Sequence, residues 1–180
     1  MMWTDFHTHN QLAAPGTAIV NLPEEALLCP VSFDLMDGAF YSAGIHPWWT
    51  AGSLEQLWQG LLFWSRHPQV VAIGECGLDK LRGADILLQK ECFVRQVELA
   101  ESCHLPVTIH CVKAFDQMLS LHKQIHPTTQ WTIHGFRGKP DLARQLLMAG
   151  FNLSFGRRYN VESWDLTPPD RRYRETDDDW

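Results

Sequence analysis

The chain has 180 residues, of which 45% are hydrophobic and 20% charged, a composition that predicts one domain spanning residues 1–180. No apolar run approaches the ~20 residues that a membrane span requires, and no charged-then-apolar leader opens the chain. The formal charge of −6 argues against a general polyanion binder, although metal ions and a local basic rim would still admit a nucleic-acid substrate. The cysteine count is odd and no C-x-x-C pair occurs, so we expect free thiols and a cytoplasmic location.

The first stretch of the chain predicts two short strands with no helix between them. Met1 to Trp3 form an apolar run, typical of a buried strand, that leads into Asp5-Phe6-His7-Thr8-His9. Residues 17–20 form a second apolar run. The gap of residues 10–16 is too small for the crossover helix that a parallel pair usually needs.

The next segment is compatible with a local antiparallel ribbon. A brief helical turn is expected over residues 24–28. Apolar and polar residues then alternate over 31–35, Asp37-Gly38 is a turn dipeptide, and another apolar run follows over 40–45.

From Gly44 onward, apolar strands alternate with amphipathic helices. Strands are expected to end near residue 46 and to cover 70–73, 106–110, 131–134, 151–155 and 172–177. Helices are expected to begin near residues 54, 85, 115 and 140, and Pro140 and Gly150 suit the start and the stop of the last one.

Eight candidate strands in a mostly βα alternation predict a compact (β/α)8 TIM-type barrel. Such a barrel usually takes ~250 residues, so several outer helices are expected to be shortened or missing. Gaps in the outer ring would expose apolar strand faces and favour a covering partner subunit, which makes a homo-oligomer one expected state. An open doubly wound sheet is the alternative fold.

Seven ionisable side chains stand at the carboxyl ends of these strands. They are His7, His9, His46, Glu75, His110, His134 and Asp177. In a barrel those ends converge on one mouth, where such folds carry their chemistry. Each residue alone is ordinary, either a core histidine or a loop acid, but gathering so many unpaired polar groups costs stability unless a cation binds them. The pattern therefore predicts a metal site.

The ligand types indicate which ions fit. Imidazoles with carboxylates suit zinc or manganese, whereas magnesium usually prefers carboxylates and water. Six ligands are too many for one tetrahedral ion, so we expect two divalent ions ~3.5–4 Å apart, bridged by Glu75 and a hydroxide. Asp177 is a candidate to ligate one ion and to accept a proton from the nucleophile.

The chain resembles the TatD-related metal-dependent deoxyribonucleases of the amidohydrolase superfamily. The motifs that carry the resemblance are Asp5-Phe6-His7-Thr8-His9, Gly44-Ile-His46-Pro47, Ala72-Ile-Gly-Glu75-Cys-Gly-Leu-Asp79, Pro106-Val-Thr-Ile-His110, Ile133-His134-Gly-Phe136 and Glu175-Thr-Asp177. The resemblance implies a barrel, a dinuclear site and phosphodiester hydrolysis, commonly on DNA ends. It also implies that His7, His9 and Asp177 hold one ion, that Glu75 bridges, that His110 and His134 hold the second ion, and that His46 meets the substrate phosphate. The chain departs from the family pattern at Val112-Lys113, where Arg-Asp is usual, and it is short before Gly44.

Basic and aromatic residues just beyond the strands suggest the substrate class. The basic residues are Lys113, Arg137, Lys139, Arg157 and Arg158, and the aromatic ones are Trp48, Trp49, Phe136 and Tyr159. We expect Lys113 and Arg137 to bind phosphate, and the aromatic rings to stack on unpaired bases. Because no dense basic stripe is present, short or single-stranded DNA or a small phosphodiester fits better than long duplex.

Three other functions stay open at this point. A cyclic-amide hydrolase of the same superfamily often bridges its metals with a modified lysine, where this chain has Glu75. A phosphatase of the histidinol-phosphatase type typically adds an Asp-x-His that is missing here. A metal-binding protein that has lost catalysis with its missing segments is the third alternative.

Overall fold

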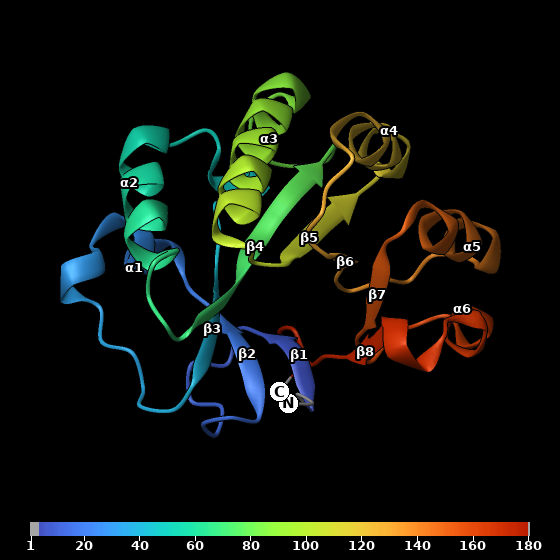
Figure 1. Cartoon of the computed structure of the whole chain (residues 1–180), viewed down its shortest axis with the longest axis horizontal. Helices are drawn as coiled ribbons and strands as arrows, with labels where there is room; N and C mark the ends of the chain where they lie inside the picture. Colours follow the sequence, from blue (N-terminus) through green and yellow to red (C-terminus); the bar gives the residue numbers. More distant parts are fainter. Residues whose placement is uncertain (1–3, 180) are drawn as a thin grey trace.

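In the computed structural model, which describes residues 4–179, eight parallel strands follow one another in chain order around a barrel (Figure 1). The strands are β1 (Asp5–Thr8), β2 (Ala18–Asn21), β3 (Phe40–Ala43), β4 (Val70–Asp79), β5 (Val107–Val112), β6 (Trp131–Ile133), β7 (Asn152–Phe155) and β8 (Arg172–Arg174). The predicted (β/α)8 barrel is therefore confirmed. The predicted start of the first strand at Met1 to Trp3 lies outside the described residues.

The barrel closes between β1 and the segment after β8, and we call this junction the seam. Thr8 and Asp177 form a parallel bridge there. The Asp177 backbone N–H donates to the His7 carbonyl at 2.9 Å, and the His9 backbone N–H donates to the Asp177 carbonyl at 3.0 Å. Two predicted ligands from the first strand are thus tied to the backbone of the predicted ligand that follows the last strand.

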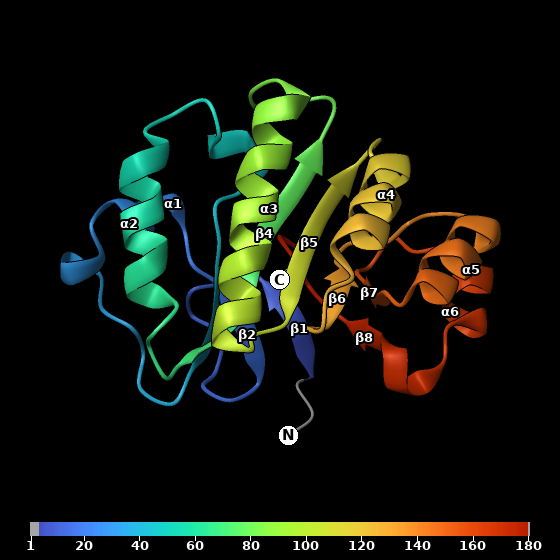
Figure 2. The ribbon, with the colours of Figure 1, turned by 45° about the horizontal axis from the view of Figure 1, so that its top comes forward.

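Helices surround only part of the barrel. They are α1 (Glu24–Leu28), α2 (Leu54–Trp64), α3 (Ile86–Cys103), α4 (Phe115–Ile125), α5 (Pro140–Ala149) and α6 (Val161–Leu166), with short 3-10 turns η1 (Pro30–Ser32), η2 (Pro47–Trp49) and η3 (Pro169–Arg171). Figures 1 and 2 show an arc of helices from α2 to α6, whereas no helix lies between β1 and β2 in the described chain and only the five-residue α1 follows β2. This agrees with the expected shortening of the outer ring. The homo-oligomer stays a prediction.

The expected antiparallel ribbon is wrong. Part of the alternating segment forms the 3-10 turn η1, which starts at Pro30, and proline has no backbone N–H to donate to a strand ladder. β3 instead pairs in parallel with β2, with Val20 opposite Tyr41. β1 and β2 also pair in parallel, although only the loop of residues 9–17 joins them. The Gln11 side chain fixes this loop by donating to the Asn21 carbonyl at 2.9 Å.

From Gly44 onward the predicted strands and helices are present, although β4 continues to Asp79, beyond the predicted 70–73, and α6 is a short helix that was not predicted. α3 is capped at its start by Asp85, whose carboxylate accepts the backbone N–H groups of Leu87 and Leu88. α5 begins at Pro140 and ends at Gly150, which has a left-handed conformation. All five cysteines are free. Within residues 4–179, none of the helices combines the length and the apolar character needed to cross a bilayer.

Candidate metal centre

Six of the side chains singled out from the sequence converge at the mouth of the barrel, around Glu75. The set comprises His7, His9, His46, His110, His134 and Asp177. They come from β1, β3, β5, β6 and the seam, which are far apart in the chain. The ends of parallel strands bring them together, as expected for a barrel.

Glu75 is held at the centre of this cluster by its backbone and by the strand next to it. Its backbone N–H donates to the Asn21 side chain at 2.7 Å. The glycines on either side allow β4 to lie close to β5, because a Cβ at Gly74 would be 2.4 Å from the Thr108 carbonyl oxygen, and one at Gly77 would be 2.0 Å from that of His110. Glu75 itself is 2% exposed.

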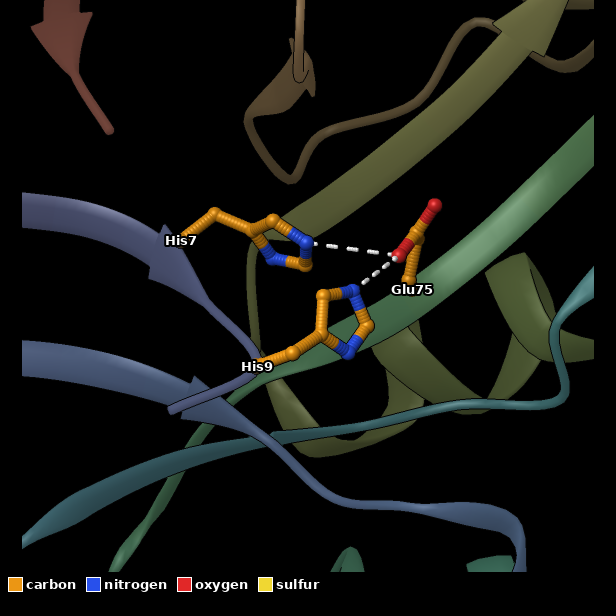
Figure 3. Close-up of side chains that lie close together, drawn as sticks. All are labelled: His7, His9 and Glu75. Atoms are coloured by element: carbon orange, nitrogen blue, oxygen red, sulfur yellow. Dashed lines mark ion pairs between the residues drawn. The ribbon is translucent and has the colours of Figure 1, made fainter. Parts of the chain in front are cut away.

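The two carboxylate oxygens of Glu75 face different histidines. Its Oε2 atom lies 3.3 Å from His7 Nε2 and 3.3 Å from His9 Nε2, and Figure 3 shows both rings directed at that oxygen. Its Oε1 atom lies 2.7 Å from His110 Nδ1 and 2.7 Å from His134 Nε2. His46 Nε2 approaches the same Oε1 atom at 3.0 Å. The carboxylate therefore has a separate set of imidazoles on each oxygen.

Asp177 completes the side of the cluster nearest the seam. Its Oδ1 atom lies 3.5 Å from His9 Nε2 and 3.8 Å from His7 Nε2. Its backbone has φ of 53°, a left-handed conformation in which an aspartate costs little. The carboxylate is 29% exposed, so solvent reaches it.

The donor set fits a divalent cation. His7 is completely buried, and neither of its ring nitrogens has a hydrogen bond to the described residues. Burying such groups without a hydrogen-bond partner costs free energy, and an imidazole nitrogen can take a metal ion as its partner. Ligand atoms from His7, His9 and Glu75 lie within 4.8 Å of one another, and so do those from His46, Glu75 and His110.

The charges in the cluster also favour a cation. Burial raises the pKa of Glu75, but the charge of His134 and hydrogen bonds from His110, His134 and His46 outweigh it and hold the pKa well below its usual range. Burial lowers the pKa of His134, yet Glu75 and Glu175 raise it well above the ordinary value. For His46, burial outweighs the effect of Glu75, and the pKa is lowered. Glu75 therefore stays ionised and attracts positive charge.

Two further carboxylates, not assigned to the site from the sequence, stand behind the histidines. Asp79 Oδ2 lies 3.2 Å from His110 Nε2, on the side of the ring away from Glu75. Glu175 Oε1 lies 3.4 Å from His134 Nδ1. Carboxylates in these positions orient a metal-binding imidazole and fix its tautomer. The alternation of side chains along a strand is the signal that was available, since Asp79 is four residues after Glu75 and shares its face.

The cluster opens into a cavity of about 280 Å³. Besides the ligand candidates it is lined by Trp48, Trp49 and Asp178. Trp48 is 39% exposed, so its indole is available to a substrate.

Not every residue expected at the mouth lies there. Lys113 and Arg137 are exposed in the loops after β5 and β6, and neither lines the cavity. The expectation that Phe136 stacks on a base is wrong, because its ring is 1% exposed and packs edge-on against Phe115 and Phe155. Tyr159 packs against neighbouring aromatic rings.

Comparisons with known proteins agree with this geometry. The chain is 34% identical over 153 residues to a 3'-5' ssDNA/RNA exonuclease TatD of Erwinia billingiae, an alignment that covers 76% of this chain and 56% of the relative. It is 35% identical over 126 residues to the 3'-5' RNA nuclease TATDN2 of Homo sapiens, covering 68% of this chain and 16% of that protein. The crystal structure of YJJV, a TatD homolog from Escherichia coli k12, superposes with a TM-score of 0.75 at 25% identity and covers 97% of this chain and 78% of the other.

The chain thus spans little more than half the length of the bacterial exonuclease that it matches. The family model described as TatD related DNase matches residues 31–178, which include Glu75, His110, His134 and Asp177. On this match, the chain belongs to the TatD-related DNase family.

Proposed function

We propose that this protein is a divalent-metal-dependent phosphodiesterase that hydrolyses single-stranded nucleic acid, beginning at its ends. The observation that carries the proposal is the two-sided environment of Glu75, with His7 and His9 at one oxygen and His110 and His134 at the other. A carboxylate placed in this way suits a bridge between two ions. The relatives named as exonucleases on ssDNA and RNA support the same substrate class.

In this proposal His7, His9 and Asp177 would hold one ion, His110 and His134 would hold the other, and Glu75 would supply a carboxylate ligand to both. Imidazole and carboxylate donors suit zinc or manganese, and magnesium is a third choice if water completes its shell. Divalent ions bound at such a site supply Lewis-acid polarisation of the phosphoryl group and acidify bound water.

His46 is the residue that would contact the reacting phosphate. Its Nδ1 atom accepts the backbone N–H of Trp48 at 3.1 Å, so the proton of the neutral ring is on Nε2. That Nε2–H group lies 3.0 Å from Glu75 Oε1, at the cavity wall. In the metal-loaded protein the ions would engage Glu75, and this N–H group would then be free to donate to a phosphate oxygen, a bond that gains strength because phosphate is charged.

Asp177 would accept the proton of the attacking water. Its carboxylate lines the cavity and is partly exposed, so it can pass that proton to solvent. Trp49, on the same cavity wall, offers a ring on which a base can stack. Stacking needs an unpaired base, which favours a single strand over a duplex. Lys113 and Arg137 would contact phosphates farther from the cavity.

The test is a Glu75→Ala substitution in the metal-loaded protein. We expect hydrolysis of single-stranded DNA and of a bis-aryl phosphodiester to disappear and the bound metal per chain to fall, because both sets of imidazoles lose their shared carboxylate. Glu162→Ala is the matched control, since Glu162 is exposed on α6. Undiminished turnover by the Glu75→Ala protein would refute the dinuclear site, and turnover of a cyclic amide alone would identify a different hydrolase.

A further inference from the structure

A cationic side chain lies beside the metal cavity without a carboxylate partner. The guanidinium carbon of Arg82 is 3.8 Å from the ring centroid of Trp48, which lines the cavity. Within residues 4–179, the Arg82 guanidinium forms no ion pair and no hydrogen bond. Stacking uses the flat face of the guanidinium, so its five N–H donors, which lie in its plane, stay available to an anion.

The backbone of Arg82 is held in place. The Gln89 side chain reaches up from α3 and donates to the carbonyls of Arg82 at 3.0 Å and of Ala84 at 2.8 Å. Next to Arg82, a Cβ at Gly83 would lie 2.2 Å from the Pro47 carbonyl oxygen, so only glycine allows the loop to lie so close to η2. An arginine on a fixed loop and a fixed ring loses little conformational entropy when it binds.

A second hollow adjoins the metal cavity at this point. It has a volume of about 470 Å³ and is lined by residues 79–86, Arg82 included. Asp79, which lines the hollow, accepts the indole N–H of Trp48, which lines the metal cavity, at 2.7 Å, so a hydrogen bond joins the linings of the two spaces. The other cation of the hollow, Lys80, is paired with Asp116 at 3.2 Å.

We propose that Arg82, carried on Trp48, binds the substrate phosphate next to the one that is hydrolysed, and that the second hollow receives the adjoining nucleotide. This inference rests on the proposed function, since it requires a substrate with more than one phosphate. A guanidinium presents paired N–H donors that match the oxygens of a phosphate, which an ammonium does not. The hollow is also of the size in which small ligands are bound.

The test compares Arg82→Ala with Arg95→Ala. Arg95 is a matched control because its guanidinium carbon also lies over an indole, 4.0 Å from the Trp58 ring, but between α3 and α2. Binding is measured by fluorescence anisotropy of metal-loaded protein with a labelled single-stranded phosphorothioate oligonucleotide that resists hydrolysis. We expect Arg82→Ala to weaken binding about tenfold or more. The slope of log affinity against log salt should fall by roughly 0.7. Arg95→Ala should change neither quantity.

Turnover measurements show whether Arg82 binds the phosphate that is hydrolysed or the one next to it. A bis-aryl phosphodiester has a single phosphate, so Arg82→Ala should leave its kcat/KM unchanged while lowering kcat/KM for an oligonucleotide. Equal losses on both substrates, or equal binding by the Arg82→Ala and Arg95→Ala proteins, would overturn the assignment. If the wild-type protein hydrolyses neither substrate, the proposed function fails, and the anisotropy comparison still decides the role of Arg82.

Discussion

Asp79→Asn tests whether the carboxylate behind His110 prepares that ring for a metal ion. Asp79 Oδ2 faces His110 Nε2 at 3.2 Å while His110 Nδ1 faces Glu75 at 2.7 Å. Burial raises the pKa of Asp79, but hydrogen bonds from Trp48, Leu81 and His110 lower it below the ordinary value, so the group is ionised at neutral pH and only accepts. When an ion occupies the cluster, Asp79 would keep the proton of His110 on Nε2 and leave the Nδ1 lone pair for the ion.

An asparagine has the same shape but replaces one acceptor oxygen by a donor. Asp79 uses Oδ1 for the Leu81 N–H and Oδ2 for the Trp48 N–H and the His110 ring, so an amide nitrogen at either position meets a donor. Loss of such a partner typically weakens metal affinity about 10–100-fold. Since each tenfold change in affinity corresponds to about 1.4 kcal/mol, the expected loss of metal-binding free energy is roughly 1.4–2.8 kcal/mol.

The assay is calorimetric titration of metal-free protein with zinc or manganese, together with thermal unfolding of the same metal-free samples. Unchanged unfolding with weakened affinity would locate the effect at the site. Asp116→Asn is the control, because Asp116 is exposed and pairs with Lys80. If Asp79→Asn binds metal as tightly as the wild type, Asp79 does not fix the His110 ring and the reasoning is refuted.

Two further predictions concern the rim and the acid stability of the protein. Replacing Lys113 and Arg137 by alanine should weaken oligonucleotide binding and leave the metal content unchanged. The slope of log affinity against log salt should fall by up to roughly 0.7 per lost phosphate contact. An unaltered slope would show that these exposed residues do not contact phosphate. Slight burial raises the pKa of Glu101, but hydrogen bonds from Thr128 and Thr129 outweigh it and lower the pKa to about 2. Because the pKa of Glu101 is lower in the folded state, its stabilisation of the fold is complete above the unfolded-state pKa and is lost as the pH falls toward 2. Glu101→Gln should therefore reduce the dependence of the unfolding temperature on pH in the acid range, measured by circular dichroism. An unchanged dependence would contradict this.

The polar residues that follow the apolar runs could be predicted from the sequence, although β4 and β5 continue beyond those runs to Asp79 and Val112. His110 and His134 are examples, and a barrel needs no further information to bring them together. The pairing of β1, β2 and β3 could not be predicted, since local alternation cannot distinguish a hairpin from neighbours in a closed parallel barrel. Tertiary closure decides that choice.

The supporting residues were harder to find than the ligand candidates. Asp79 and Glu175 contact histidines from other strands, and apart from the position of Asp79 on the same strand face as Glu75, nothing nearby in the chain indicates those contacts. Arg82 and Phe136 show that position along the chain does not determine whether a side chain is exposed at the mouth of the barrel. Both follow strand ends, yet one lies on a cavity-lining tryptophan and the other is buried in the core.

The seam at Thr8 and Asp177 couples assembly of the centre to completion of the barrel. If the seam opens, His7 and His9 separate from Asp177, and an ion held by all three opposes that opening. Metal occupancy should therefore slow hydrogen exchange at the amides of His9 and Asp177, whose hydrogen bonds cross the seam. A single cation would in this way stabilise the junction between the first strand and the segment after the last.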